Sequence, residues 1–377
     1  MAQLLKRADS EGKKGIVLIS HRELPFLQLA ERLNLSCFKT LSDNFKIILH
    51  IGWYHQKFYC PKWLDCLITS PSNLGEIRRN GACFRNICSR DVLPSEFSLN
   101  QKDSKRYDCV YICNNSRNKR AREFFELVKA MPDKKFAFVL SYPDNADPVK
   151  FDSRLPAEIR QYQESLGDKS NLDFFDAKHT ESGYALSRSD IAGILNQSKI
   201  YVHMCRREGE SRSLGEALAC GCHLALHSDF VGGATDICNK DNSIRFSTSS
   251  DLETQIRSVL ESGVDSEKNA AEYAEIRSRT LIQLRSLLRE YGMDQTEIDE
   301  LFLQDLSMVL PGHTSPQFPR AKYTGNADIT DINEFCGFLK LCGIEVEPSK
   351  LRFFEFALRM RSLLVNLAQS IKSRKVF

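Results

Sequence analysis

The sequence has no apolar run that could cross a membrane and no strong excess of one charge. No stretch approaches the roughly 20 apolar positions of a membrane helix, and the segment from Met1 to Lys14 is too polar for a secretory leader. The formal net charge is +3, which does not indicate nucleic-acid binding unless a basic groove forms locally. We therefore expect a soluble, cytoplasmic protein without a nucleic-acid partner.

Paired CxxC motifs, a common mark of structural zinc sites, are also absent. The 13 cysteines among 377 residues are an odd number, with spacings such as Cys60 to Cys66 and Cys220 to Cys222. Free thiols in a reducing compartment are the expected interpretation, and a metal site is the lesser alternative. We predict no metal and no separate cofactor.

What the sequence does contain is a repeated alternation of strand and helix patterns. Apolar segments in its first third indicate strands at 16–19, 47–51, 66–69 and 84–88, with helices expected at 24–33 and 71–78. Such alternation predicts a parallel sheet with right-handed crossovers. A polar stretch at 94–108 then has the composition of a linker.

The alternation starts again after this linker and then gives way to helices. Strands are expected at 109–113, 136–141, 172–175, 200–204, 223–227 and 243–246, and helices at 117–130, 189–197 and 213–219. Beyond residue 250, helices are expected at 251–261, 267–291, 295–308 and 348–375. The sequence thus predicts an α/β fold in three parts: 1–105, 106–250 and a helical extension, 251–377.

The segment 205–222 carries the strongest chemical signal. A buried strand leads into a polar loop, and a helix is expected to begin at Ser213. The N–H groups of a helix start are unpaired and the helix dipole adds positive potential, so this junction suits a diphosphate. Arg207 and Arg212 offer forked guanidinium donors to phosphate oxygens.

Two acids of this segment, Glu208 and Glu216, have the chemistry to hold sugar hydroxyls. Carboxylates accept hydrogen bonds from vicinal hydroxyls, so the pair suits a sugar ring and a ribose. Each acid also has an ordinary structural interpretation. Ser213-Leu214-Gly215-Glu216 matches a capping box, and Glu208 alone fits a solvated loop acid. From the residues alone both alternatives stay open.

The order of residues across this segment resembles the signature of the large retaining glycosyltransferase family with the GT-B fold. In that family Glu-Gly is followed, after six positions, by Glu-Ala and then Ala-x-Gly. This chain has Glu208-Gly209, then Glu216-Ala217, then Ala219-Cys220-Gly221. The likeness covers about 110–246 well and the first part of the chain in outline.

The resemblance extends upstream and includes departures. Lys119 falls where the family carries a lysine for the donor diphosphate, whereas Asn114 stands at the usual arginine position, so Arg117 is expected to substitute. Ser211 and Ser213 stand where the family usually has Gly and Pro.

The resemblance implies two Rossmann-like domains with a deep cleft between them and a last helix that packs back on the first domain. It implies an active hexosyl- or pentosyltransferase of glycan biosynthesis, which moves a sugar from a nucleotide diphosphate sugar to a hydroxyl acceptor with retention and without metal. The expected catalytic residues are Glu208 and His50, with His21 and His55 as other candidate histidines. The expected donor contacts are Arg117, Lys119, Arg207, Gly209, Glu210, Ser211, Arg212, Ser213, Leu214 and Glu216.

Other functions stay open at this stage. The expected acceptor is a carbohydrate or glycoconjugate, and the basic pattern of 348–375 also allows peripheral contact with an anionic membrane. The main alternative is a catalytically silent GT-B scaffold that binds sugar nucleotides or proteins. A different nucleotide-dependent enzyme on the same fold, such as an epimerase, is the third hypothesis.

Overall fold

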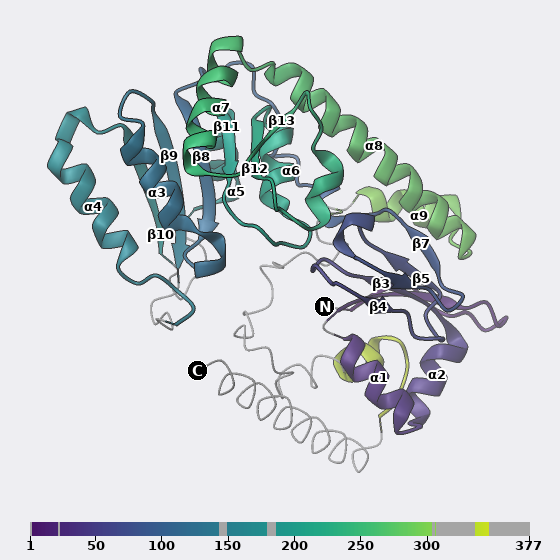
Figure 1. Cartoon of the computed structure of the whole chain (residues 1–377). Coiled ribbons are helices and arrows are strands. Elements are labelled where there is room, and N and C mark those ends of the chain that lie inside the picture. Colours follow the sequence, from purple (N-terminus) through teal and green to yellow (C-terminus); the bar gives the residue numbers. More distant parts are fainter. Residues whose placement is uncertain are drawn as a thin grey trace.

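The computed structural model describes residues 2–21, 23–142, 149–178, 186–303, 306 and 336–346. Within them the chain forms two α/β units, which are joined by a linker and by one long helix (Figure 1). The first unit is the sheet built from residues 3–85 with the helices on its faces, and the second is the sheet built from residues 107–246 with its helices.

The first sheet has five strands. Their order is β1 (Gln3–Lys6), β2 (Gly15–Ser20), β3 (Phe45–His50), β5 (Cys66–Ile68) and β7 (Cys83–Arg85). β1 runs antiparallel to β2, and the other neighbours are parallel. The strands expected at 16–19, 47–51, 66–69 and 84–88 are confirmed, whereas the short edge strand β1 was not expected.

Helices cover both faces of the first sheet. Val17 and Ile19 pack with α1 (Leu24–Arg32) and α2 (Ser36–Asn44), whereas Ile16 and Leu18 pack with α8 (Ser266–Glu290) and α9 (Gln295–Leu303). Successive side chains of a strand point to opposite faces, which explains this division. Figure 1 shows the two helix pairs on opposite sides of the sheet. Helix α8 therefore completes the core of the first unit although it follows the second unit in the chain.

The second sheet is parallel throughout and has six strands. Their order is β10 (Leu172–Lys178), β9 (Phe136–Tyr142), β8 (Tyr107–Asn114), β11 (Ser198–His203), β12 (His223–His227) and β13 (Ser243–Phe246). The strand order reverses between β8 and β11, as in the doubly wound dinucleotide-binding fold. The expectation of an α/β fold with two Rossmann-like units is confirmed.

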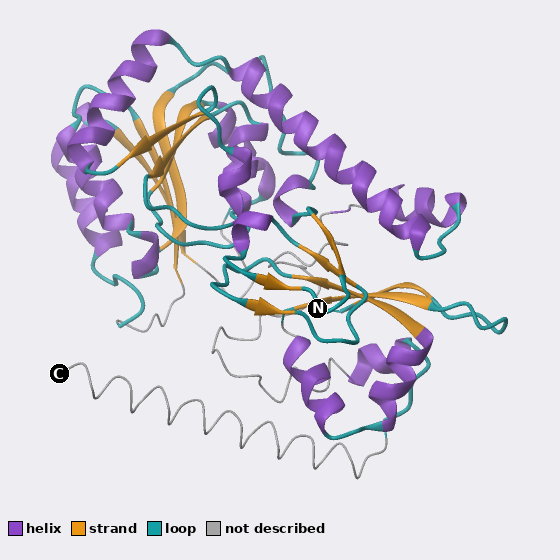
Figure 2. Ribbon diagram, turned by 45° about the vertical axis from the view of Figure 1, so that its right-hand side comes forward, coloured by secondary structure: helices purple, strands orange, loops and turns teal. Residues whose placement is uncertain are grey.

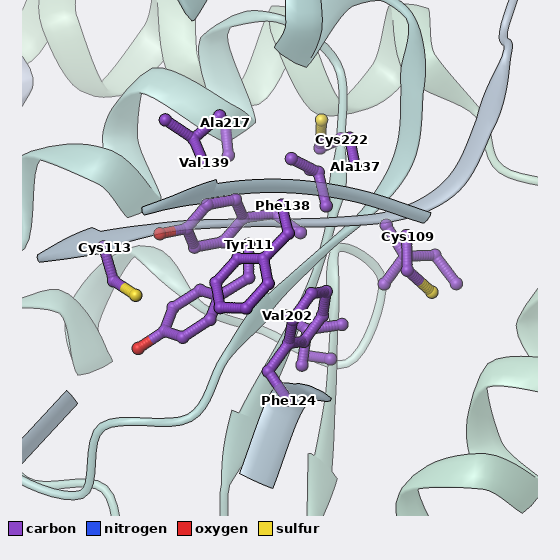
Figure 3. Close-up of a cluster of buried hydrophobic side chains, with 14 of the residues drawn as sticks. Cys109, Tyr111, Cys113, Phe124, Ala137, Phe138, Val139, Val202, Ala217 and Cys222 are labelled. Atoms are coloured by element: carbon purple, nitrogen blue, oxygen red, sulfur yellow. The ribbon is translucent and has the colours of Figure 1, made fainter. Parts of the chain in front are cut away.

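Helices and aromatic side chains build the core of the second unit. The helices are α3 (Ala121–Ala130), α4 (Leu155–Leu166), α5 (Arg188–Asn196), α6 (Arg212–Ala219) and α7 (Ser249–Ser262). Figure 2 shows them around the strands. Inside, the ring of Phe138 lies 4.9 Å from that of Phe124 and 6.1 Å from that of Tyr111, centroid to centroid (Figure 3). This rigid core fixes the positions at which β8 and β11 end.

Helix α8 bridges the two units. Near its start Tyr273 is buried in the core of the second unit, and near its end Leu287 is buried in that of the first. The course of this long helix from one unit to the other can be followed in Figure 2. No helix in the described part of the chain is long and apolar enough to cross a membrane.

The helix expected at 71–78 is wrong. The structure has a 3₁₀ turn at Pro71–Asn73 and a short strand β6 (Ile77–Arg78), which pairs with β4 (Phe58–Tyr59). The Asn73 side-chain amide donates to the Ile51 carbonyl at 3.0 Å. This hydrogen bond ties the turn to the first sheet, and that tertiary contact overrides the local helical pattern.

The helix expected at 117–130 is interrupted. Arg120 has φ +54°, which separates the 3₁₀ turn Arg117–Lys119 from α3. Helices α2 and α4 were not expected, because both are rich in polar residues. The helix expected at 348–375, with its possible membrane contact and its packing on the first unit, lies outside the described residues.

Candidate functional site

The strand order of the second sheet places a ligand position at the carboxyl ends of β8 and β11. In open α/β sheets, ligands bind where the strand order reverses. The segments that follow these two strands meet there. Lys119 follows β8 and Glu208 follows β11, and the Lys119 ammonium forms an ion pair with the Glu208 carboxylate. Residues 89 positions apart in sequence are thus brought together at the switch point.

Each member of this pair keeps the other ionised. Burial alone raises the pKa of Glu208, but Lys119 and His203 outweigh it, and the pKa lies well below its usual range. Burial lowers the pKa of Lys119, and Glu208 more than restores it. His203 Nε2 lies 3.0 Å from Glu208 Oε2, on the side away from Lys119. The site therefore holds a fixed positive and a fixed negative charge near neutral pH.

Helix α6 begins immediately beside this pair. It starts at Arg212, one residue earlier than expected, with Ser211 as the N-cap residue, and no side chain caps it. Arg212, Ser213 and Leu214 form its first turn, whose N–H groups have no partner within the helix. An anion at this position gains both these N–H groups and the helix dipole.

The capping-box interpretation of Glu216 is wrong. Its Oε1 lies 3.8 Å from Nε of Arg212, one turn earlier in the same helix. Burial raises the pKa of Glu216, and Arg212 opposes that rise only in part. A capping box does occur in this unit, between Ser187 and Asp190 at the start of α5.

The loop that leads into α6 contacts the first unit closely. The Glu210 N–H donates to the Gly52 carbonyl at 2.8 Å. A Cβ atom added to Gly209 would lie 1.7 Å from that same oxygen, so only glycine fits there. Gly52 lies two residues after the end of β3, so the carboxyl edges of both sheets meet at this loop.

Glu210 is the centre of a buried polar contact between the units. Its Oε2 lies 3.0 Å from His50 Nε2 and accepts from both the N–H and the hydroxyl of Ser89, each at 2.8 Å. His50 and Glu210 are 1% and 8% exposed, so water does not compete for these bonds. Burial raises the pKa of Glu210, but His50, Arg90 and Ser89 lower it by more than burial raises it. The pKa of Glu210 is therefore below its usual value.

An ion pair crosses the same boundary. Arg90, which is 1% exposed, donates from Nη2 to Asp236 Oδ1 at 2.6 Å. The Ser70 hydroxyl donates to the other oxygen of Asp236 at 2.9 Å. Ser89, Arg90 and Asp236 were not predicted from the sequence. Ser89 and Arg90 belong to a polar Ser-Arg-Asp run directly after an expected strand, and nothing in that pattern identifies their partners.

Other expected site residues and candidate histidines each contact a different part of the protein. The Arg207 guanidinium lies over the Tyr54 ring, 5.3 Å from its centroid, and so also reaches the first unit. Arg117 begins the 3₁₀ turn before Lys119, and its N–H donates to the Lys150 carbonyl. His21 packs against Trp53 and His55 against Phe58, both within the first unit. Among the candidate histidines, His50 contacts the α6 loop, through Glu210.

A separate surface pocket lies far from these residues along the strands. It is lined by Leu99, Asn100, Gln101, Lys102 and Glu267. The linker residues precede β8, so this pocket lies at the amino ends of the strands. Ligands of open α/β sheets bind at the opposite edge, at the carboxyl ends of the strands.

Comparison with models of known protein families gives no match for this sequence, and comparison with curated proteins gives none either. Solved structures do match. The pneumococcal O-GlcNAc transferase GtfA, in complex with UDP and GlcNAc, is 13% identical with a TM-score of 0.47, over 71% of this chain and 60% of that one. TarM is 12% identical with a TM-score of 0.45, over 74% of this chain and 55% of that one.

A third match is sucrose-phosphate synthase from Thermosynechococcus elongatus, 15% identical with a TM-score of 0.45, over 76% of this chain and 74% of that one. The chain spans 60% of the length of GtfA and 55% of that of TarM. With TM-scores below 0.5, these likenesses carry no conclusion about the sugar, the acceptor or the reaction. The strands and contacts of the chain itself show a two-unit α/β protein in which Lys119 and Glu208 meet at the switch point of the second sheet.

Proposed function

We propose that this protein is a glycosyltransferase that moves a sugar from a nucleotide diphosphate sugar to a hydroxyl of a carbohydrate or glycoconjugate. The observation that supports this most strongly is the meeting of Lys119 and Glu208 at the switch point, beside the start of α6. One cation, a helix start and two acids have the chemistry that a diphosphate-linked sugar requires.

In this proposal the positive groups stabilise the leaving diphosphate. Lys119 and the first-turn N–H groups of α6 bear on the phosphates, with Arg117, Arg207 and Arg212 as further donors. Preorganised donors aimed at the charge that develops on the leaving group lower the barrier without a metal ion. Because the positive charge is supplied by the chain, we propose a metal-independent transfer.

The acids bind the hydroxyl groups. Glu208, held ionised by Lys119, accepts from the hydroxyls of the transferred sugar, and Glu216 accepts from the ribose. The departing phosphate oxygen takes the proton of the acceptor hydroxyl on the face that it leaves, which gives retention at the anomeric carbon. The carboxyl edge of the first sheet, which faces the α6 loop, receives the acceptor.

His50 has a positioning role in this proposal. Its Nε2 lies against the buried Glu210 carboxylate and not toward open space. Through Glu210 it holds the 208–211 loop, and with it Glu208, in place.

Isothermal calorimetry and a transfer assay with uridine, guanosine and adenosine diphosphate sugars test the proposal. We expect one nucleotide to bind, and Lys119→Ala to weaken its binding by about 10- to 100-fold, because a hydrogen bond to a charged group contributes about 1.5–3 kcal/mol. Lys129→Ala is the matched control, since Lys129 is a partly exposed lysine of the same unit, paired with Glu126. If all three classes of donor neither bind nor react, the transferase proposal fails, and the scaffold interpretation replaces it.

A further inference from the structure

Three side chains with metal-binding atoms converge behind the Lys119–Glu208 pair. They are His203 at the end of β11, Cys205 two positions later, and Glu208. One ligand atom of each lies within 4.8 Å of the others, and His203 Nε2 is 3.0 Å from Glu208 Oε2. Imidazole, thiol and carboxylate together are a ligand set typical of zinc.

Both ring nitrogens of His203 and one carboxylate oxygen of Glu208 are buried without a hydrogen-bond partner in the described part of the chain. His203 is 1% exposed. The contact between Glu208 Oε2 and His203 is close but not aligned for a hydrogen bond. Buried polar atoms are nearly always satisfied, so these atoms point to a missing ligand.

The contacts around this group leave its ligand atoms available to a cation. The Cys205 thiol lies 3.0 Å from the Arg207 carbonyl oxygen, a weak contact that a metal bond can replace. Aromatic rings pack around His203, with Phe230 at 5.2 Å and Tyr201 at 6.2 Å between centroids.

We propose that His203, Cys205 and Glu208 form a zinc-binding site with a fourth position left for water. On binding, Cys205 loses its proton to solvent and forms a Zn–S bond, while His203 and Glu208 Oε2 donate lone pairs. Zinc bond lengths of about 2.0–2.3 Å put tetrahedral ligand atoms about 3.3–3.8 Å apart, so closing the set needs shifts of about 1 Å. Glu208 Oε1 keeps its contact with Lys119.

The ion takes no part in the proposed reaction, which needs no metal, but its site shares Glu208 with that reaction. A zinc ion on Glu208 withholds that carboxylate from a sugar, so in the proposed transferase the ion is an inhibitor. This consequence rests on the proposed function, whereas the binding test below uses no nucleotide sugar and stands apart from it.

Cobalt(II), a spectroscopic substitute for zinc, tests the site in the chelator-treated full-length protein. We expect one equivalent to bind with the visible bands of tetrahedral cobalt and a thiolate charge-transfer band, and zinc to displace it. Cys205→Ser abolishes the thiolate band and weakens binding at least tenfold, and His203→Gln weakens it similarly. Cys238→Ser is the matched control, because Cys238 is a partly buried cysteine of the same unit outside the group.

A fourth variant separates ligand loss from damage to the fold. Lys119→Met removes an ammonium that repels the ion, so it tightens cobalt binding, while the same change weakens binding of a nucleoside diphosphate. Circular dichroism and thermal unfolding establish that each variant is folded. The proposal is overturned if the wild type binds no stoichiometric cobalt, or if folded Cys205→Ser keeps the thiolate band.

Discussion

At the residue scale, Lys119 and Glu208 are paired with each other. A ligand that binds only one of them therefore has to displace the other. In the proposed transferase, a free nucleoside diphosphate binds the ammonium, whereas the sugar of a complete donor binds the carboxylate. The two ligands therefore respond differently to the loss of Glu208.

Glu208→Gln is expected to raise the affinity for a nucleoside diphosphate by about two- to fivefold, because it removes a partly exposed ion pair that contributes up to about 1 kcal/mol. The same change lowers sugar transfer by about 10- to 100-fold, because a charged hydrogen bond to the sugar is lost. Calorimetry with the diphosphate and initial rates with the donor measure the two effects. Glu126→Gln, an exposed acid of α3, leaves both unchanged; equal loss of both properties contradicts the assigned role.

Several residues of this site could be predicted from the sequence, but the residues that they contact could not. The segment around Glu208 was identified by its residue order, and Lys119 by its match to a lysine of the family that the sequence resembles. His50 was expected to touch a sugar, but its partner is Glu210, 160 positions away. Contacts between a histidine of one unit and a carboxylate of the other depend on how the units dock, which local patterns do not encode.

At the scale of single elements, the α6 loop depends on a glycine. Gly209→Ala places a methyl group 1.7 Å from the Gly52 carbonyl oxygen. The loop has to move, so we expect a loss of about 1–3 kcal/mol in the free energy of unfolding, as for an overpacked core, and loss of the donor site. Urea unfolding and donor calorimetry measure both.

Gly193→Ala is the control for that change. Gly193 lies inside α5 and a Cβ atom there meets nothing within 4 Å. Alanine in a helix interior stabilises by about 0.5–1 kcal/mol relative to glycine, so this variant gains stability and keeps donor binding. A Gly209→Ala protein as stable as the wild type speaks against the close docking of the loop.

Helix α8 makes a separate prediction about the first unit. Leu287 is fully buried against the first sheet, so Leu287→Ala is expected to cost about 2–5 kcal/mol. Ile282→Ala on the same helix is the control, because Ile282 is 65% exposed and changes stability by less than about 0.5 kcal/mol. Both tryptophans, Trp53 and Trp63, belong to the first unit, so their fluorescence in urea reports its unfolding. Equal midpoints for the two variants would show that α8 is not part of that core.

Helices and strands were predicted well where apolar periodicity was strong. They were predicted poorly where tertiary contacts determine the local conformation. Buried strands such as β11 (Ser198–His203) contain continuous apolar runs, and they appear where expected. The polar helix α4 and the turn at Pro71–Asn73 were missed. The first lacks a strong apolar stripe, and the second is fixed by the Asn73 side chain and the carbonyl of a neighbouring strand.

At the scale of the whole molecule, the contacts of Glu210 make the free energy of unfolding depend on pH. Its pKa is lowered in the folded protein, so its contribution is complete above the unfolded value of about 4.3 and is lost as the pH falls toward the folded value. We expect Glu210→Gln to cost about 1–3 kcal/mol at pH 7, and the difference from wild type to shrink below about pH 4. Thermal unfolding from pH 7 to pH 3 measures this difference. A gap that is constant across the range would rule out the charge as its source.

The chain passes between the two units at two places that lie next to each other. The linker after β7 and the start of α8 touch through Gln101 Nε2 and Glu267 Oε1 at 3.1 Å, and the N–H of Leu93 donates to the hydroxyl of Tyr273 on α8. These two adjacent covalent connections form a hinge between the units, and rotation about it would separate His50 from Glu210. In the proposed transferase, we expect donor entry and release to require that rotation.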